Sequence, residues 1–129
     1  MSSKNAALAR PELDAADMLG MTAETFDALP FGVIRLDGDG RVVDYNAAES
    51  KFAKRAKEQV VGKLFFRDVA PCAQGADFEG RLQTLLSANT ERSEAFDYDF
   101  RFPWGARSVR IRLLVDKKHN VWVFVTLLT

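Results

Sequence analysis

Two side chains near the start of a predicted helix, Tyr45 and Glu49, place a phenol and a carboxylic acid four residues apart. This spacing brings two groups to one helix face. Periodicity alone favours a structural role, with Tyr45 in the core and Glu49 at the surface. In the functional alternative both groups point inward at a buried acceptor, and desolvation keeps the acid protonated so that it donates a hydrogen bond. Such a pair would stabilise a buried anion.

Cys72 is the only cysteine of the chain and therefore its only thiol. A lone cysteine is usually an inert, small hydrophobic residue. Here Pro71 fixes the backbone directly before it, in a loop between predicted helical segments, where functional sites are common. This placement makes Cys72 a candidate functional residue.

A cysteine hydrolase would also need a base, and His119 is the only histidine. His119 falls in a predicted turn at 116–120, so we expect an exposed side chain with no catalytic or haem-binding role. A second cysteine and an HxxxH-like spacing, which a metal site would need, are both missing. Gly38 and Gly40 belong to a hairpin turn and form no phosphate-binding motif. The sequence therefore predicts no enzyme and no metal site.

The elements that position these residues begin with two predicted strands, 31–36 and 41–45. The turn sequence Asp37-Gly38-Asp39-Gly40 separates them. Asn46 is a predicted N-cap because its side chain can accept from the free amides of the first helical turn. The candidate phenol would then end a strand, and the candidate acid would lie in that first turn. Irregular helical segments continue to Lys63.

The second half of the chain predicts one longer helix and three more strands. Leucines at helical spacing indicate a helix over 78–88, which Asn89 ends. Alternating apolar residues predict strands over 96–102 and 109–115, and the run 121–128 is apolar on both faces, as expected of a central strand. The predicted fold class is α+β, with a five-stranded antiparallel sheet covered by helices on one face.

The first thirty residues differ from the rest, since they are rich in Ala, Asp and Glu. Their pattern predicts two short helices, one over 13–19 and one that Thr22 caps and Pro30 ends. We therefore expect an N-terminal helical cap, residues 1–30, on a core of residues 31–129, together forming a single domain.

Composition restricts the partners of this 129-residue chain. Its 18 basic and 18 acidic residues give a net charge of zero, which disfavours binding to nucleic acid or to a membrane surface by bulk charge. No apolar run approaches the ~20 residues that cross a bilayer, and the start of the sequence lacks a secretory pattern. We expect a cytoplasmic protein that is a monomer or a weak dimer.

Several segments together resemble the photoactive yellow proteins, which are bacterial PAS-fold blue-light receptors. The resemblance extends from about residue 31 to residue 125 and is specific, because the motifs are long and a cysteine lies in register with them. The segments are Leu36-Asp37-Gly38-Asp39-Gly40, Tyr45-Asn46-Ala47-Ala48-Glu49, Phe65-Phe66, Asp68-Val69-Ala70-Pro71-Cys72, Phe78-Glu79-Gly80 and Trp122-Val123-Phe124-Val125.

The resemblance implies that Cys72 holds p-coumaric acid (4-hydroxycinnamic acid) as a thioester. Tyr45 and a protonated Glu49 would donate hydrogen bonds to its phenolate, and Arg55 would screen the pocket from solvent. In the family, light isomerises the chromophore from trans to cis and the glutamic acid passes its proton to the phenolate. The buried carboxylate then loosens the N-terminal cap. A downstream signalling protein, which the sequence does not identify, would receive this change.

Three departures from the family pattern have consequences. Ala53 replaces a threonine whose hydroxyl supports the tyrosine, so one hydrogen bond is missing. The stretch Phe102-Pro103-Trp104-Gly105 differs from a loop whose methionine assists dark recovery, and Trp104 is nearest to that methionine. The region up to Leu29 matches weakly, so the cap can have another shape.

Other function classes are compatible with the sequence. A PAS module without a chromophore would serve dimerisation or ligand sensing, and the absence of a visible absorption band would distinguish it. A small cysteine-dependent enzyme would need a base near Cys72. A flavin-binding PAS domain is disfavoured because its Asn-Cys-Arg signature is absent.

Overall fold

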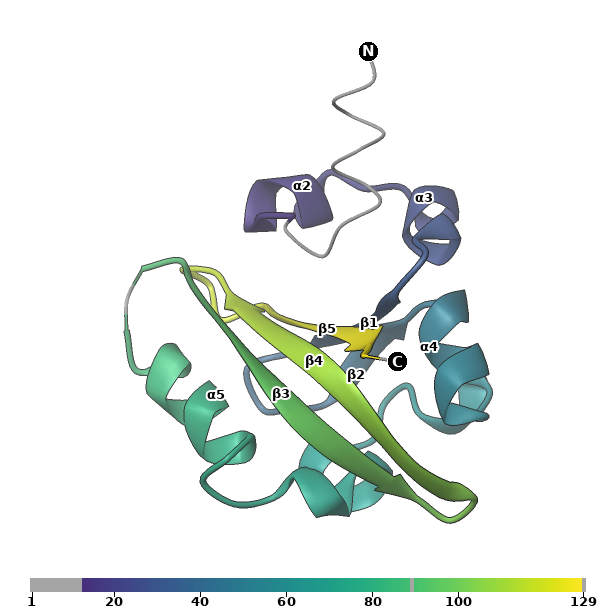
Figure 1. Cartoon of the computed structure of the whole chain (residues 1–129). Coiled ribbons are helices and arrows are strands. Elements are labelled where there is room, and N and C mark those ends of the chain that lie inside the picture. The colour runs from purple at the N-terminus through teal and green to yellow at the C-terminus, as the bar shows by residue number, and fades with distance from the viewer. Residues whose placement is uncertain (1–12, 89, 129) are drawn as a thin grey trace.

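A five-stranded antiparallel sheet forms the centre of the molecule (Figure 1). The computed structural model describes residues 13–88 and 90–128. The strands are β1 (Gly32–Leu36), β2 (Val42–Tyr45), β3 (Arg92–Phe102), β4 (Gly105–Val115) and β5 (Val121–Leu127). They lie in the order β2-β1-β5-β4-β3, so β5 is central. The α+β class, the five antiparallel strands and the central position of the last strand are confirmed.

Short helices and single helical turns lie before β1 and between the strands. They are α2 (Ala15–Leu19), α3 (Ala23–Ala28), α4 (Ala47–Ala53) and α5 (Glu79–Leu86), with the turns η1 (Lys57–Gln59), η2 (Phe65–Val69) and η3 (Pro71–Ala73). Two predicted N-caps are confirmed. The Thr22 side chain accepts from the Thr25 amide at 3.1 Å, and the Asn46 side chain accepts from the Glu49 amide at 3.0 Å.

The longest described helix, α5, is shorter than its predicted span. It begins only after Phe78, whose φ of −131° and ψ of −68° are not helical, and Ser87 is its C-cap. Leu82 and Leu85 are buried, as their spacing predicts. Asn89, the predicted end of this helix, lies outside the described residues.

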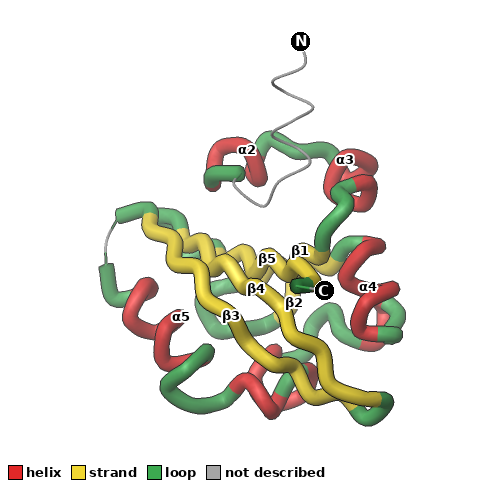
Figure 2. The backbone as a smooth tube through the Cα atoms, in the orientation of Figure 1, coloured by secondary structure: helices red, strands yellow, loops and turns green. Residues whose placement is uncertain are grey.

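Apolar side chains form a core on each face of the sheet, because neighbouring strand residues point to opposite faces. Ile34 and Leu113 belong to the core under α5, whereas their neighbours Val33 and Leu114 belong to a second core with α2 and α3. Figures 1 and 2 show α2 and α3 on the side of the sheet away from α5. Helices therefore cover both faces of the sheet. The prediction of helices on one face only is wrong, because α2 and α3 pack on the other face. The boundary at residue 30 stays a prediction.

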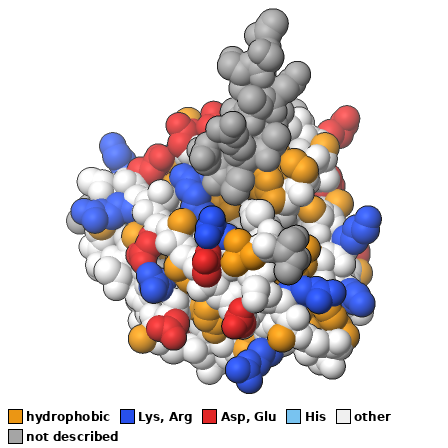
Figure 3. Space-filling view, in the orientation of Figure 1, with side chains coloured by type: hydrophobic (Ala, Val, Ile, Leu, Met, Phe, Trp, Pro, Cys, Tyr) orange, Lys and Arg blue, Asp and Glu red, His pale blue; other side chains and the backbone are white. Residues whose placement is uncertain are grey.

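Charged side chains of both signs are mixed over the face seen in Figure 3, with no large area of one sign. Within the described part of the chain, no helix is long and apolar enough to cross a membrane. In the same part, no three side chains of His, Cys, Asp or Glu are grouped so that they could hold a metal ion.

Candidate functional site

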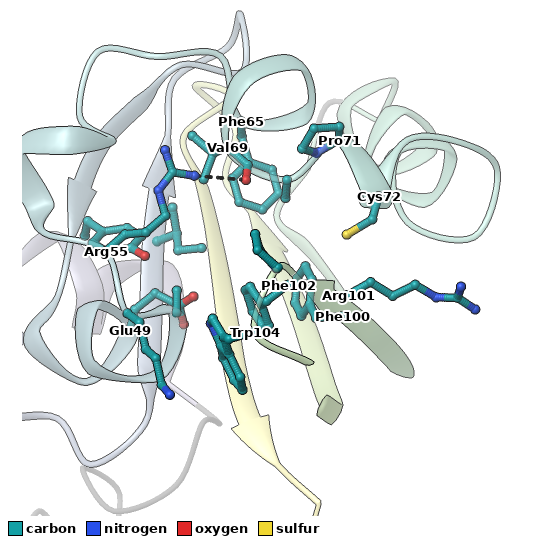
Figure 4. A pocket seen from close by; sticks show the side chains of 16 residues that line it. Glu49, Arg55, Phe65, Val69, Pro71, Cys72, Phe100, Arg101, Phe102 and Trp104 are labelled. Atoms are coloured by element: carbon teal, nitrogen blue, oxygen red, sulfur yellow. Dashed lines mark hydrogen bonds between the residues drawn. The ribbon is translucent and has the colours of Figure 1, made fainter. Parts of the chain in front are cut away.

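A cavity of about 580 Å³ lies between α4, the turns η2 and η3, and the end of β3 with the hairpin loop that follows it (Figure 4). It is lined by all four residues selected from the sequence, Tyr45, Glu49, Arg55 and Cys72, and also by Ala53. Residues from separate segments thus meet at one partly open cavity. The cavity is the candidate functional site.

Tyr45 and Glu49 lie on either side of the junction between β2 and α4. Tyr45 ends β2 opposite Ile34 of β1. The Asn46 side chain caps α4 and so places Glu49 in the first helical turn. Only 1% of Tyr45 and 4% of Glu49 is exposed. The structural interpretation that leaves Glu49 at the surface is therefore wrong, and both side chains are buried beside the cavity.

The polar ends of these two side chains have no partners. Tyr45 Oη and Glu49 Oε1 are buried and make no hydrogen bond. Burial raises the pKa of the Glu49 carboxyl from 4.5 to about 8, so this acid is largely protonated at neutral pH and can donate. Burial, and next the charge of Glu49, raise the pKa of the Tyr45 phenol, while Arg55 lowers it. Both groups are therefore free to donate a hydrogen bond.

Gly32 provides the space that the Glu49 carboxyl group occupies, a role that the sequence analysis missed. A Cβ atom at position 32 would lie 2.1 Å from Glu49 Oε1 and 3.2 Å from Glu49 Cβ. Any other residue would therefore displace the acid. The one available signal was a glycine inside a predicted strand, which often marks a close approach.

Arg55 closes one side of the cavity. The preceding residue, Lys54, is the C-cap of α4 and has a φ of 58°, so the chain turns sharply there. Arg55 Nη1 then donates to the Val69 carbonyl at 3.2 Å, across to η2 (Figure 4). This contact links the end of α4 to η2, the turn directly before the one that carries Cys72.

Cys72 lies in η3, the 3₁₀ turn that Pro71 begins. Its backbone carbonyl accepts a hydrogen bond from Tyr98 Oη at 2.5 Å, which anchors the turn to β3. The residue is exposed, and Figure 4 shows its sulfur directed toward the cavity. A small acyl donor can therefore reach the thiol from solvent.

His119 takes no part in this site. It is exposed in the turn between β4 and β5 with a φ of 64°, as the sequence predicts. No histidine is among the residues that line the cavity with Cys72. The histidine that the cysteine hydrolase interpretation invokes is therefore not at this cavity.

The hairpin between β3 and β4 supplies another part of the cavity wall. Trp104 lines the cavity there, and its ring stacks on Phe102 with 4.9 Å between centroids and 4° between planes. Gly105 follows with a φ of 146°, a conformation that favours glycine. The segment that departs from the family loop is thus part of the site.

Comparison with known proteins gives a consistent result. A sequence model of the PAS fold matches residues 26–115. The photoactive yellow protein of Halochromatium salexigens is 36% identical over 111 residues, covering 84% of this chain and 86% of the relative. That of Rhodothalassium salexigens is 34% identical over 109 residues, with the same coverage.

A solved structure agrees with these sequence matches. The photoactive yellow protein domain of the sensor histidine kinase Ppr from Rhodospirillum centenum superposes with a TM-score of 0.79 at 35% identity. The match covers 85% of this chain and 96% of that domain. The similarity therefore extends over most of the chain in structure as well as in sequence.

Proposed function

The chain belongs to the photoactive yellow protein family of PAS-fold photosensors, and we propose that it senses blue light through p-coumaric acid bound to Cys72 as a thioester. The observation that carries this proposal is one cavity with the only thiol of the chain at its wall and two buried, unpartnered donors, Tyr45 Oη and Glu49 Oε1. Buried polar groups without partners are rare in folded proteins, so an acceptor is expected between them.

The chemistry of the cavity suits an aromatic acid with a phenol group. Its volume of about 580 Å³ lies in the ~300–1,000 Å³ range of small-molecule pockets. Tyr45 and protonated Glu49 would donate to the phenolate, and hydrogen bonds to a charged oxygen are among the stronger ones. Arg55 would limit the access of water from one side. These residues would keep the phenol ionised at neutral pH.

When bound, p-coumaric acid supplies the light-driven step, a trans-to-cis isomerisation of its double bond. Glu49 would then transfer its carboxyl proton to the phenolate oxygen, which leaves a neutral phenol and a buried carboxylate. A buried charge without a partner costs several kcal/mol, roughly the size of a domain's stability. Partial unfolding, including release of the N-terminal cap, would follow as the signal.

The output would pass to a separate or linked signalling protein. One relative is a domain of a sensor histidine kinase, which supports a kinase-type partner for this chain as well. We place the protein in the cytoplasm, where a thiol such as Cys72 stays reduced until it is acylated. No catalytic step is assigned to the chain.

Reconstitution tests the proposal directly. The protein is treated with an activated derivative of p-coumaric acid, and absorption and peptide mass are recorded. We expect a visible band, and an added acyl group on the peptide that contains Cys72. Cys72→Ser and Cys72→Ala should both abolish the band, because no other residue offers a thiol.

Two results would contradict the proposal. A yellow product in Cys72→Ala would show that the attachment site is wrong. No band in the folded wild-type protein would instead favour a PAS module without a chromophore.

A further inference from the structure

Trp104 is held firmly in the wall of the cavity by contacts on its ring. It stacks on Phe102, as described above, and two cations lie over the ring. Lys54 Nζ is 4.4 Å and Arg107 Cζ is 5.1 Å from its centroid. Cations near an aromatic face are attracted to it. The orientation of the indole is therefore fixed by its neighbours.

The indole N–H of Trp104 has no acceptor. Trp104 Nε1 is buried and makes no hydrogen bond, and an indole nitrogen can only donate. Figure 4 shows the nitrogen edge of the ring turned toward the carboxyl group of Glu49. A buried donor without a partner is costly, so this N–H is also expected to meet an acceptor in the cavity.

Three unpartnered atoms therefore surround the same space. Among residues 13–88 and 90–128, five buried side-chain polar atoms lack a partner, and three of these belong to cavity-lining residues. They are Tyr45 Oη, Glu49 Oε1 and Trp104 Nε1. An anionic oxygen has several lone-pair directions and can accept from more than one donor.

We propose that Trp104 is a third donor to the chromophore, and that its indole N–H bonds to the phenolate oxygen beside Tyr45 and Glu49. This inference rests on the proposed function. The proposed hydrogen bond comes from the hairpin between β3 and β4, the segment that departs from the family pattern. In a pocket where Ala53 offers no hydroxyl, the indole would supply part of the anion's stabilisation.

Nuclear magnetic resonance of ¹⁵N-tryptophan-labelled protein tests the bond. The chain has two tryptophans, and Trp104→Phe assigns both indole signals by removing one. When p-coumaric acid is attached and ionised, the Trp104 indole proton should move downfield. It should return when acid protonates the phenolate. The signal of Trp122, which lies in the core with α2 and α3, should not move and is the internal control.

A dark-state acid titration of the visible band gives the second readout. Trp104→Phe keeps an aromatic ring beside Phe102, Lys54 and Arg107 but removes the N–H. A hydrogen bond to a charged group is worth about one to two pKa units, so the pKa of the chromophore should rise by that amount.

The outcomes separate the two proposals. No visible band in the wild type overturns both the photoreceptor assignment and this inference. A band with an unmoved Trp104 signal, or an unchanged pKa of the chromophore in Trp104→Phe, overturns the inference and leaves the photoreceptor assignment standing.

Discussion

At the scale of single residues, the site depends on what burial does to a carboxylic acid. Glu49 has no cationic partner at its unpaired oxygen, so desolvation raises the pKa of its carboxyl to about 8. A neutral acid can donate a hydrogen bond and can later lose its proton. The same side chain is therefore suited both to stabilise an anion and to be the source of a transferred proton.

Glu49→Gln separates these two roles. An amide is a weaker donor than a carboxylic acid, so the localised charge of the phenolate is less stabilised in the ground state. We expect the visible band of the reconstituted variant to shift to longer wavelength. Infrared difference spectra of the wild type should show a protonated carboxylic acid that loses its proton after a flash. If that signal is missing, or persists in Glu49→Gln, the role of Glu49 is refuted.

Ala53→Thr tests the departure beside the phenol. Ala53 lines the cavity, and Tyr45 Oη has no partner. A threonine hydroxyl would support Tyr45 and strengthen its bond to the phenolate. Because one net hydrogen bond is worth ~1 kcal/mol, the pKa of the chromophore should fall by somewhat less than one unit. The visible band should move to shorter wavelength.

Ala47→Thr is a matched control for that variant. Ala47 lies on the same helix but is exposed, and it does not line the cavity. It should change neither the band nor the pKa of the chromophore. A red shift in Ala53→Thr, or a higher pKa, would show that the argument about the missing hydroxyl is wrong.

At the scale of elements, Asn46 joins the helix of the acid to the N-terminal helices. Its Oδ1 accepts from the amides of Val33 at 2.9 Å and Glu49 at 3.0 Å. Its Nδ2 donates to the carbonyls of Phe26 at 3.2 Å and Phe31 at 3.0 Å. The side chain is fully buried and uses its full set of donors. The side-chain amide of Asn46 therefore links β1, α4 and α3 by hydrogen bonds.

Asn46→Ala should accordingly destabilise the protein more than the loss of an ordinary cap. It leaves several buried backbone groups without partners, and each costs about 1–3 kcal/mol. We expect a loss of roughly 3 kcal/mol or more in the free energy of unfolding, measured by urea titration. Hydrogen exchange should also become faster in α3 and in the first turn of α4.

Thr22→Ala provides the comparison, since Thr22 is an N-cap of the same region but is exposed. That change should cost about 1 kcal/mol. Equal losses for the two variants would mean that Asn46 acts as a cap alone and does not connect the elements.

At the scale of the whole molecule, the sheet separates two hydrophobic cores. Glu49 lies beside β1, a strand that contributes side chains to both cores. Its carboxyl touches Gly32 of β1. The next residue of that strand, Val33, belongs to the core under α2 and α3. A negative charge on Glu49 would therefore destabilise the region around β1, against which α2 and α3 pack. Release of these two helices is the expected consequence.

The stability of the chromophore-free protein should consequently depend on pH through this one acid. Its pKa is about 8 in the fold and 4.5 as the ordinary value. Between these values the folded state holds a proton that the unfolded state has released, so stability falls as the pH rises. At 1.36 kcal/mol per pKa unit, the loss across this window is on the order of 5 kcal/mol.

Thermal or urea unfolding of wild type and Glu49→Gln between pH 4.5 and pH 8 measures this effect. The variant has no titrating group at this position and should lose most of the slope. Parallel curves for the two proteins would mean that Glu49 is not the group responsible.

Local chemistry explains what the sequence by itself determined. Apolar stretches, alternation and a turn motif predicted the strands, and side-chain capping predicted the starts of α3 and α4 at Thr22 and Asn46, because these signals act between near neighbours. The motif around Tyr45 and Glu49, with Cys72 in register, also carried the resemblance to the family, and that resemblance supplied the proposed site residues. Each of these features depends on type and spacing along a short stretch of chain.

Only the tertiary structure decided which way Glu49 points. Periodicity predicted that this side chain is exposed, whereas it is buried. The tertiary structure also revealed the role of Gly32, which leaves space for the side chain of Glu49 from α4. It likewise revealed the second core, to which α2 and α3 contribute. Trp104 was visible in the sequence as a departure, yet its unpartnered N–H exists only where the hairpin meets α4. Burial and unsatisfied polar groups are properties of packing between distant segments, so local sequence patterns do not reveal them.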